Sequence, residues 1–439
     1  MSAITRAVDR LPAPGVSPRL LERARTALGA VALLTVVVCS ALIVVSSAGG
    51  RSLLVPGYGH RFPAWLSGPL PALDPLRWSQ FGSLLLVLVG GYLVLALGLG
   101  RIRGWVLGVA IVGLHLLVFL GPPLLSRDVF NYIEYARLGA VHHLNPYDHG
   151  AMSAPLDPAL HYLGWRYIPT VYGPVYTLAS YASAGFGLAG ALWAMKAFTC
   201  AVALGALALL RVCALRLGRD PVAPVALVGL NPIWLLYAVG GVHNDVLMVA
   251  PMLVAIALYL SRRPLAAGAS VAVAAGVKLT GAILLPFMLA ASRERGRLLS
   301  GAGAGAAAIA ALALLAFGPH VLDLFGLLAR QQDLDGLRSV QHVLGEAGLA
   351  APAHALRSLG TLAVALVTVW QLVRVRRGAD WISAAGWSVL ALLLATSWLM
   401  PWYAVWLLPL AALGASRGLR GAALVLTAYL AIVSVLPAG

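Results

Sequence analysis

The acidic residue Asp128 lies beside Arg127, where a long apolar run ends and a polar stretch begins. Tyr132 and Tyr135 follow at helical spacing, so the three side chains would share one stripe of a helix. A carboxylate in that setting, at the mouth of a cavity, could act as a general base and accept the proton of a substrate hydroxyl. The alternative is that Asp128 only caps the helix that follows it.

Lys278, one of two lysines in the chain, interrupts an apolar stretch in the segment GVKLTG. The runs on either side, 264–277 and 279–291, are short for a bilayer span and predict a hairpin of half-length helices. An ionisable group within a membrane is costly and therefore indicates function, and an ammonium group can hold a phosphate as a point charge. The alternative is that Lys278 extends to the lipid headgroups.

Three consecutive polar residues, His243, Asn244 and Asp245, stand in a glycine-flanked turn between two apolar runs. Such a turn could bind sugar hydroxyl groups. Alternatively, Asn244 or Asp245 caps the next helix.

An aromatic cluster occupies the segment SWLMPWYAVW. Its members are Trp398, Trp402, Tyr403 and Trp406. Aromatic belts at the membrane interface have this composition. Stacking on a sugar or a polyprenyl chain is the alternative.

Histidines His142, His143 and His149 lie near one another, but their spacing matches no common zinc pattern. We therefore expect a polar loop there, with no metal site and no cofactor.

The composition indicates that a lipid bilayer, and not water, surrounds most of the chain. Of 439 residues, 61% are hydrophobic and 10% charged, whereas soluble domains carry about 25% charged residues. This excludes a cytosolic enzyme, a single-anchor receptor and a disordered protein. The net charge of +16 does not indicate nucleic acid, because the cations form short clusters between apolar runs rather than one basic face.

The apolar runs predict an all-α fold, a polytopic integral membrane bundle of about 13 transmembrane helices, each of which needs about 20 residues. The predicted spans are 27–47, 81–100, 104–123, 191–213, 221–239, 245–261, 264–277, 279–291, 298–318, 354–373, 381–399, 402–416 and 420–437. The glycine-rich segment GAGAGAAA within one span predicts close helix packing.

Residues 1–26 are expected to form a cytoplasmic tail, because 20 of the 31 Lys and Arg residues then fall on the inner side. Residues 27–437 would form a single transmembrane domain in the bacterial plasma membrane, with no separate soluble domain. Its long loops 48–80, 124–171 and 319–353 would face outwards, with ten of the fifteen carboxylates on that side. Within them, 128–140 predicts an amphipathic helix at the membrane interface.

Five motifs occur in order: RDVFNYIEYARLG with NPYDHG, then YGPVY, NPIWLLYAVGGVHND, GVKLTGAILLP and PWYAVWLLPL. In this order they resemble the bacterial polyprenol-phosphate-mannose-dependent mannosyltransferases of the GT-C superfamily, especially the alpha-1,6-mannosyltransferases of lipomannan assembly. The resemblance covers roughly residues 105–415. It implies a GT-C-type fold with an extracytoplasmic active site, a polyprenyl-phosphate sugar donor rather than a nucleotide sugar, inversion at the anomeric carbon, and a glycolipid or glycan acceptor.

By this resemblance, Asp128 is the expected base and Lys278 the basic residue that meets the donor phosphate, for which Arg127 is a second candidate. The candidates for substrate binding are Tyr132, Tyr135, Asn145, Tyr147, Tyr172, His243, Asn244, Asp245, Trp402 and Tyr403.

Two other functions fit the same features. A polyprenyl-sugar flippase or another transporter would also be polytopic, but transporters commonly carry internal repeats, and none is evident here. An enzyme of the same architecture could transfer another sugar, such as arabinofuranose, because these motifs handle phosphate and hydroxyl groups in general.

Overall fold

Helices are the regular elements throughout the part of the chain that the structure describes, which confirms the all-α prediction. The computed structural model describes residues 17–55, 62–331, 334, 336, 339–346 and 353–435. Within these ranges, five helices are long and apolar enough to cross a membrane. They are α2 (Pro18–Ser47), α4 (Trp78–Ala96), α8 (Gly187–Arg216), α13 (Arg295–Phe317) with its continuation to Arg330, and α16 (Ala353–Arg376).

A sixth span is possible where α9 (Val222–Gly229) meets the π-helix η3 (Ile233–Val239) at a bend of 50°. The predicted count of about 13 is therefore not confirmed. Most of the other predicted spans correspond to shorter apolar helices, because prolines and polar residues interrupt the apolar runs. These are α5 (Gly104–Leu120), α10 (Asn244–Leu260), α11 (Pro264–Val277), η4 with α12 (Leu279–Ala291), α17 (Trp381–Ala395), η6 with α18 (Pro401–Leu413) and α19 (Arg417–Val433).

Helix α2 starts earlier than the predicted span, at Pro18, because Ser17 caps it and proline suits the first helical turn. Residues 18–26 of the predicted tail are therefore helical, while residues 1–16 lie outside the described part of the chain. The predicted loops contain short helices of their own. These are α3 (Ala64–Ser67), α6 (Asp128–Ala140), η1 (Ala151–Ser153), η2 (Pro158–Tyr162), η5 (Gly318–Leu322), α14 (Asp323–Gln331) and α15 (Val340–Glu346).

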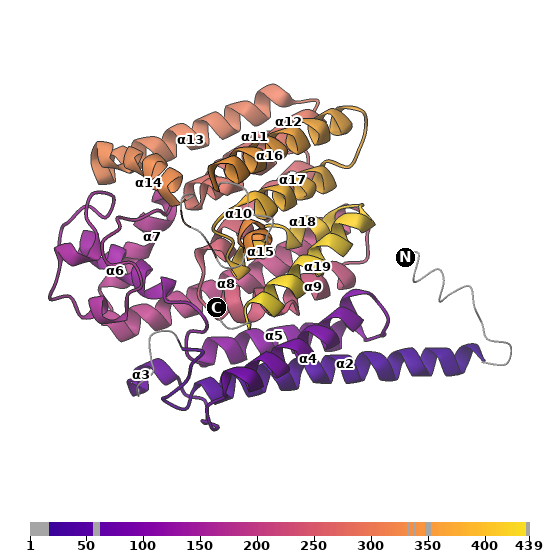
Figure 1. Ribbon diagram of the computed structural model, residues 1–439. Helices are drawn as coiled ribbons and strands as arrows, with labels where there is room; N and C mark the ends of the chain where they lie inside the picture. The colour runs from indigo at the N-terminus through magenta and orange to yellow at the C-terminus, as the bar shows by residue number, and fades with distance from the viewer. Residues whose placement is uncertain are drawn as a thin grey trace.

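Helix α6 forms where it is predicted, but the structure buries both of its stripes instead of leaving the polar one open. Its position at the membrane interface stays a prediction. Val129 and Ile133 on one stripe are buried, and so are Tyr132 and Tyr135 on the other. Helix α7 (Pro174–Ala184) covers it. Figure 1 shows α6, α7 and α14 at one end of the long helices, opposite the start of α2.

A buried polar network holds the bend between α9 and η3. The Asn231 side-chain oxygen accepts from the backbone N–H of Ile233 at 2.9 Å, and its amide nitrogen donates to Tyr92 Oη and Thr427 Oγ1 at 3.0 Å each. Asn231 thus satisfies the backbone groups that the bend releases. The π-helix beyond it leads into the His243 turn, and such helices are frequent at functional sites.

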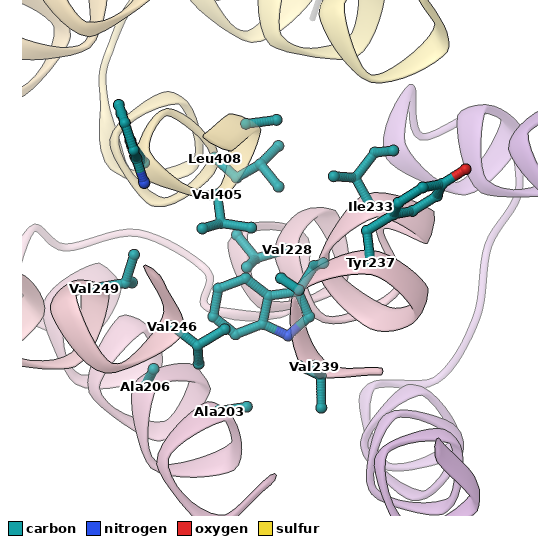
Figure 2. Packing of buried hydrophobic residues seen from close by; sticks show 14 of the residues in the cluster. Ala203, Ala206, Val228, Ile233, Tyr237, Val239, Val246, Val249, Val405 and Leu408 are labelled. Carbon is teal, nitrogen blue, oxygen red and sulfur yellow. The ribbon is translucent and has the colours of Figure 1, made fainter. Parts of the chain in front are cut away.

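Apolar side chains also pack around the π-helix η3 and the turn at His243. In Figure 2, side chains of η3, α10 and η6 meet, among them Val239, Val246 and Val405. All three are buried, so close packing of apolar side chains supports the His243 turn.

Glycines bring α11 and α13 into contact, as the segment GAGAGAAA predicts. A Cβ atom on Gly301 would overlap the backbone oxygen of Leu265, and one on Gly305 would lie 2.9 Å from Ala272 Cβ. A Cβ atom on Gly303, on the far side of the same helix, would have no neighbouring atom of the described chain within 4 Å.

We expect Gly301→Ala to destabilise the protein by about 1–3 kcal/mol, because overpacking forces two helix backbones apart. Gly303→Ala is the matched control, and it should be neutral or slightly stabilising because alanine favours helix. Thermal unfolding of both variants in the same detergent measures the difference. Equal melting temperatures would contradict this packing.

Candidate active site

Two strained turns position the first part of the site. Leu125 and Val242 are non-glycine residues with positive φ angles of 62° and 59°. Such backbone strain persists only where surrounding structure enforces it, and it clusters at functional sites. The two segments are joined by a hydrogen bond of 2.9 Å from Leu124 N to Gly240 O. Asp128 and His243 follow the two turns, so their separation is set by the backbone.

Asp128, His243, Tyr132 and Trp402 form the first half of the site. Asp128 Oδ2 lies 3.5 Å from His243 Nδ1, and Tyr132 Oη lies 3.5 Å from the same nitrogen. The Trp402 ring stacks on the imidazole, with centroids 3.7 Å apart. The imidazole is buried, whereas 19% of the Asp128 side chain stays exposed. Asp128 can therefore reach a ligand while His243 holds it in place.

The protonation states of these groups follow from burial. Burial raises the pKa of Asp128 to about 6, as does the Asp245 carboxylate, while Lys278 and a hydrogen bond to Ser126 oppose the rise. Burial, and then the positive charge of Lys278, holds the pKa of His243 well below its ordinary value. The contact between Asp128 and His243 is therefore one between a carboxylate and a neutral ring at neutral pH, not an ion pair.

An ion pair between Lys278 and Asp245 forms the second half of the site. The Nζ–Oδ1 distance is 2.6 Å, and Trp406 Nε1 donates to the same oxygen at 2.6 Å. The Lys278 ammonium also lies 4.5 Å from the centre of the Tyr403 ring. Asp245 is 1% exposed and Lys278 20%, so the cation is the member of the pair that a ligand can reach.

The chain breaks its helix to place this cation. Helix α11 ends at Val277, and Lys278 is extended, with φ −154° and ψ 127°, before η4 begins. This confirms two half-length helices. Gly173 N donates to Val277 O at 3.1 Å, and a Cβ atom on Gly173 would overlap Gly276 O. Only glycine lets the loop after Tyr172 approach the end of α11 this closely.

Tyrosines surround the base. Tyr132 meets Tyr172 and Tyr176 edge to face at 4.8 and 5.1 Å, and Tyr135 Oη donates to Ile168 O at 2.9 Å. Burial raises the pKa of Tyr132 and Tyr172 well above the ordinary value, so both phenols stay protonated.

The simpler interpretations of these residues do not hold. Asp128 is the first residue of α6, but the residue in the capping position is Arg127, and Asp128 interacts with His243. Lys278 does not extend to headgroups, because it pairs with Asp245. Trp402 and Trp406 are not a lipid-facing belt, because they contact His243 and Asp245.

Other candidate residues lie away from this group. Asn145 Nδ2 donates to Phe317 O at 2.6 Å, and Tyr147 Oη donates to Tyr172 O at 2.7 Å, so both hold the loop in place. Arg127 is exposed and forms no ion pair with any described residue. Asn244 is buried beside His243, and neither polar atom of its side chain has a hydrogen-bond partner among the residues that the structure describes.

Some contributors were absent from the residues assigned to the site by the resemblance, although Trp406 belongs to the predicted aromatic cluster. Trp406 holds Asp245, Tyr176 packs on Tyr132, and Gly173 admits the loop. Gly241 is a fourth, because a Cβ atom there would lie 2.7 Å from His243 Cδ2. Trp406 and Tyr176 stand in the motifs PWYAVW and YGPVY, which were the available signal.

One residue of the histidine-rich segment, His142, contacts an ion pair between Arg137 and Asp157. Asp157 accepts from Arg137 Nε at 2.9 and 3.0 Å and contacts His142 Nε2 at 2.6 Å. Across the described ranges, no three His, Cys, Asp or Glu side chains group as metal ligands would.

Comparisons with known proteins give the family. A family model described as "Alpha-(1->6)-mannopyranosyltransferase, N-terminal domain" matches residues 37–294, which include Asp128, Asp245 and Lys278. A model of the MptB C-terminal domain matches residues 337–439.

Three relatives carry the same kind of name. An alpha-(1->6)-mannopyranosyltransferase A of Mycobacterium tuberculosis is 29% identical over 371 residues, or 77% of this chain and 70% of the relative. The protein of that name in Corynebacterium glutamicum is 30% identical over 173 residues, or 38% and 35% of the two chains. A probable alpha-(1->6)-mannopyranosyltransferase of Mycolicibacterium smegmatis is 25% identical over 377 residues, or 72% and 66%.

The first family model covers more than half of the chain, and its match contains both charged halves of the site. The apolar helices agree with a membrane protein of this kind. The chain therefore belongs to the alpha-(1->6)-mannopyranosyltransferase family and is a membrane glycosyltransferase.

Proposed function

We propose that the protein transfers a mannosyl residue from a polyprenyl-phosphate donor to a hydroxyl group of a glycan or glycolipid acceptor, with inversion. The observation that carries the proposal is that a reachable carboxylate, Asp128, and a reachable ammonium, Lys278, share one site. The first suits an acceptor hydroxyl and the second an anionic leaving group.

The reaction needs one base and no acid. The acceptor oxygen attacks the anomeric carbon and passes its proton to Asp128, while the bond from that carbon to the phosphate oxygen breaks. The phosphate leaves as a stable anion, which Lys278 stabilises as charge develops on it. An alpha product formed by inversion requires a donor with a beta linkage.

The remaining residues position the reactants. His243 orients the Asp128 carboxylate, Tyr132 contacts the same imidazole nitrogen, and Asp245 orients Lys278. The partly exposed rings of Tyr172, Trp402 and Tyr403 can pack on the sugar or the first isoprene units. Roles of the other candidates are less direct. Tyr135 and Asn244 would line the site, Arg127 would add a second cation for the donor phosphate, and Asn145 and Tyr147 would act only through the loop.

Mannose is favoured over arabinofuranose, because the names of the relatives specify mannopyranosyl transfer. A flippase is not favoured. A proton acceptor beside a phosphate-binding cation suits the transfer of a sugar from phosphate to a hydroxyl group, and transport of the lipid needs neither group.

We also propose that the shorter apolar helices cross the membrane with the long ones, about thirteen crossings in all. The N-terminus would then be cytoplasmic and the site extracytoplasmic, because Arg clusters such as 293–297 collect at the opposite ends of the helices.

Cysteine labelling tests this orientation. The native cysteines Cys39, Cys200 and Cys213 are buried, so background labelling should be low. A cysteine replacing Asp148, which is 45% exposed, should react with an impermeant maleimide in intact cells. A cysteine replacing the exposed Arg293 should react only after permeabilisation. The reverse pattern would place the site in the cytoplasm.

Asp128→Asn should lower turnover by roughly 10²–10⁴-fold, because the amide keeps the shape of the side chain but cannot accept the proton. Donor affinity should change little. Initial rates with polyprenyl-phosphate-mannose and a membrane lipid extract measure this. Asp148→Asn removes an exposed carboxylate from the same loop, and it is the matched control expected to stay within a few-fold of wild type.

The pH profile gives a second measurement of the same claim. With a pKa of about 6, Asp128 is ionised and active above that pH, so kcat/KM should fall about tenfold per pH unit below it. Asp128→Asn should lack this acidic limb. Full turnover by the Asn variant would mean that another group accepts the proton, with Asp245 the next to test.

Lys278→Ala should weaken donor binding by about 10–100-fold and leave acceptor KM nearly unchanged, because a charge-assisted hydrogen bond to phosphate contributes on the order of 1.5–3 kcal/mol. Lys278→Arg should retain part of the affinity. The Ala variant also leaves Asp245 without its partner. The double variant Lys278→Met with Asp245→Asn separates this destabilisation from lost affinity. Normal donor affinity in all three variants would show that Lys278 does not bind the donor phosphate.

A further inference from the structure

Two tryptophans near Asp128 take no part in the site described above. Trp165, in the loop after η2, and Trp398, after α17, meet edge to face with ring centroids 5.9 Å apart. Both are half-buried, so part of each indole is accessible. They are 233 positions apart in the chain and meet only because of the fold.

The first tryptophan is held by the first turn of α6. Asn131 Nδ2 donates to Trp165 O at 2.9 Å. A Cβ atom on the neighbouring Gly164 would lie 3.9 Å from the Arg127 side chain and from Asn131 Oδ1. Asn131 follows Asp128 by three residues, a rise of roughly 4.5 Å along a helix. The Trp165 backbone is therefore anchored to the same turn of α6 that begins with Asp128.

The second tryptophan, Trp398, is held close to Trp402 in the first half of the site. Four residues after Trp398 comes Trp402, which stacks on His243 at 3.7 Å. The residues between them include Leu399 and Met400, which are 0% and 9% exposed. This short buried connection fixes Trp398 relative to the site.

We propose that Trp165 and Trp398 form a binding surface for the sugar chain of the acceptor, next to the hydroxyl that Asp128 deprotonates. This rests on the proposed mannosyl transfer. Sugar rings present C–H faces that pack on indole, and half-buried aromatic rings supply that contact with little loss of side-chain freedom. Lys278 draws the anionic donor to the other half of the site, which leaves this side to a neutral ligand. The ligand class is a short mannose chain.

Acceptor length provides the test. Soluble mannosides of one to four linked residues are used as acceptors with saturating polyprenyl-phosphate-mannose. For wild type, acceptor KM should fall as the chain lengthens. Trp165→Ala and Trp398→Ala should each raise KM for the longer acceptors by roughly three- to tenfold, with donor KM unchanged. Phenylalanine at either position should restore part of the affinity.

Tyr167→Ala is the control, because this aromatic residue of the same loop is 77% exposed. Its acceptor KM should match wild type. The proposal is overturned if the Ala variants keep the wild-type dependence on length, as interfacial anchors would, or if donor and acceptor KM rise together. If either Ala variant does not fold, the Phe variants and the other position decide. Failure of the wild type to use this donor would instead reject the proposed function.

Discussion

The ion pair between Lys278 and Asp245 is the interaction on which the arrangement of the site depends. The buried Asp245 carboxylate needs a partner and further hydrogen bonds, and the Lys278 ammonium and the Trp406 indole N–H supply them. Helix α11 must therefore end where α10 begins, so that both charges meet at one level. The half-length helices around Lys278 follow from this requirement, and so does the glycine contact that brings Tyr172 beside it.

Constrained backbone positions the first half of the site, with Asp128 and His243, relative to this ion pair. The turns at Leu125 and Val242 have positive φ angles, and a hydrogen bond joins the two segments. At the bend that leads into the π-helix, the Asn231 side chain accepts a hydrogen bond from the backbone N–H of Ile233. Groups that stabilise a developing charge act best when they are already in place, and the strain here is maintained by packing from several helices.

The electrostatics of the two halves are coupled. Lys278 lowers the pKa of Asp128 and Asp245 raises it, so the nearby ion pair partly cancels its own effect and burial dominates. The result is a carboxyl group with a pKa near neutrality, which suits a base. Burial, assisted by the charge of the same lysine, holds the pKa of His243 low and keeps the ring neutral, so it orients Asp128 without neutralising it. In the proposed reaction, this pair would therefore influence both the binding of the donor phosphate and the proton transfer to Asp128.

The sequence by itself determined the all-helical membrane class, because composition and apolar runs depend on local content. It also indicated the break at Lys278 and the residues Asp128, His243 and Asp245, because polar groups are rare in so apolar a chain. It could not say how many helices reach the length of a span, since prolines and buried polar residues shorten several of them.

Only the tertiary structure separated the alternatives for each residue, because the deciding contacts join residues far apart in the chain. Asp128 is distinguished from a cap by His243, and Trp402 from a lipid anchor by the same ring. Asn145 and Tyr147 looked like ligand-binding residues, yet they bond to backbone oxygens of the scaffold. Helix α6 has a polar stripe that suggested exposure, but periodicity describes one helix and not the layer that covers it.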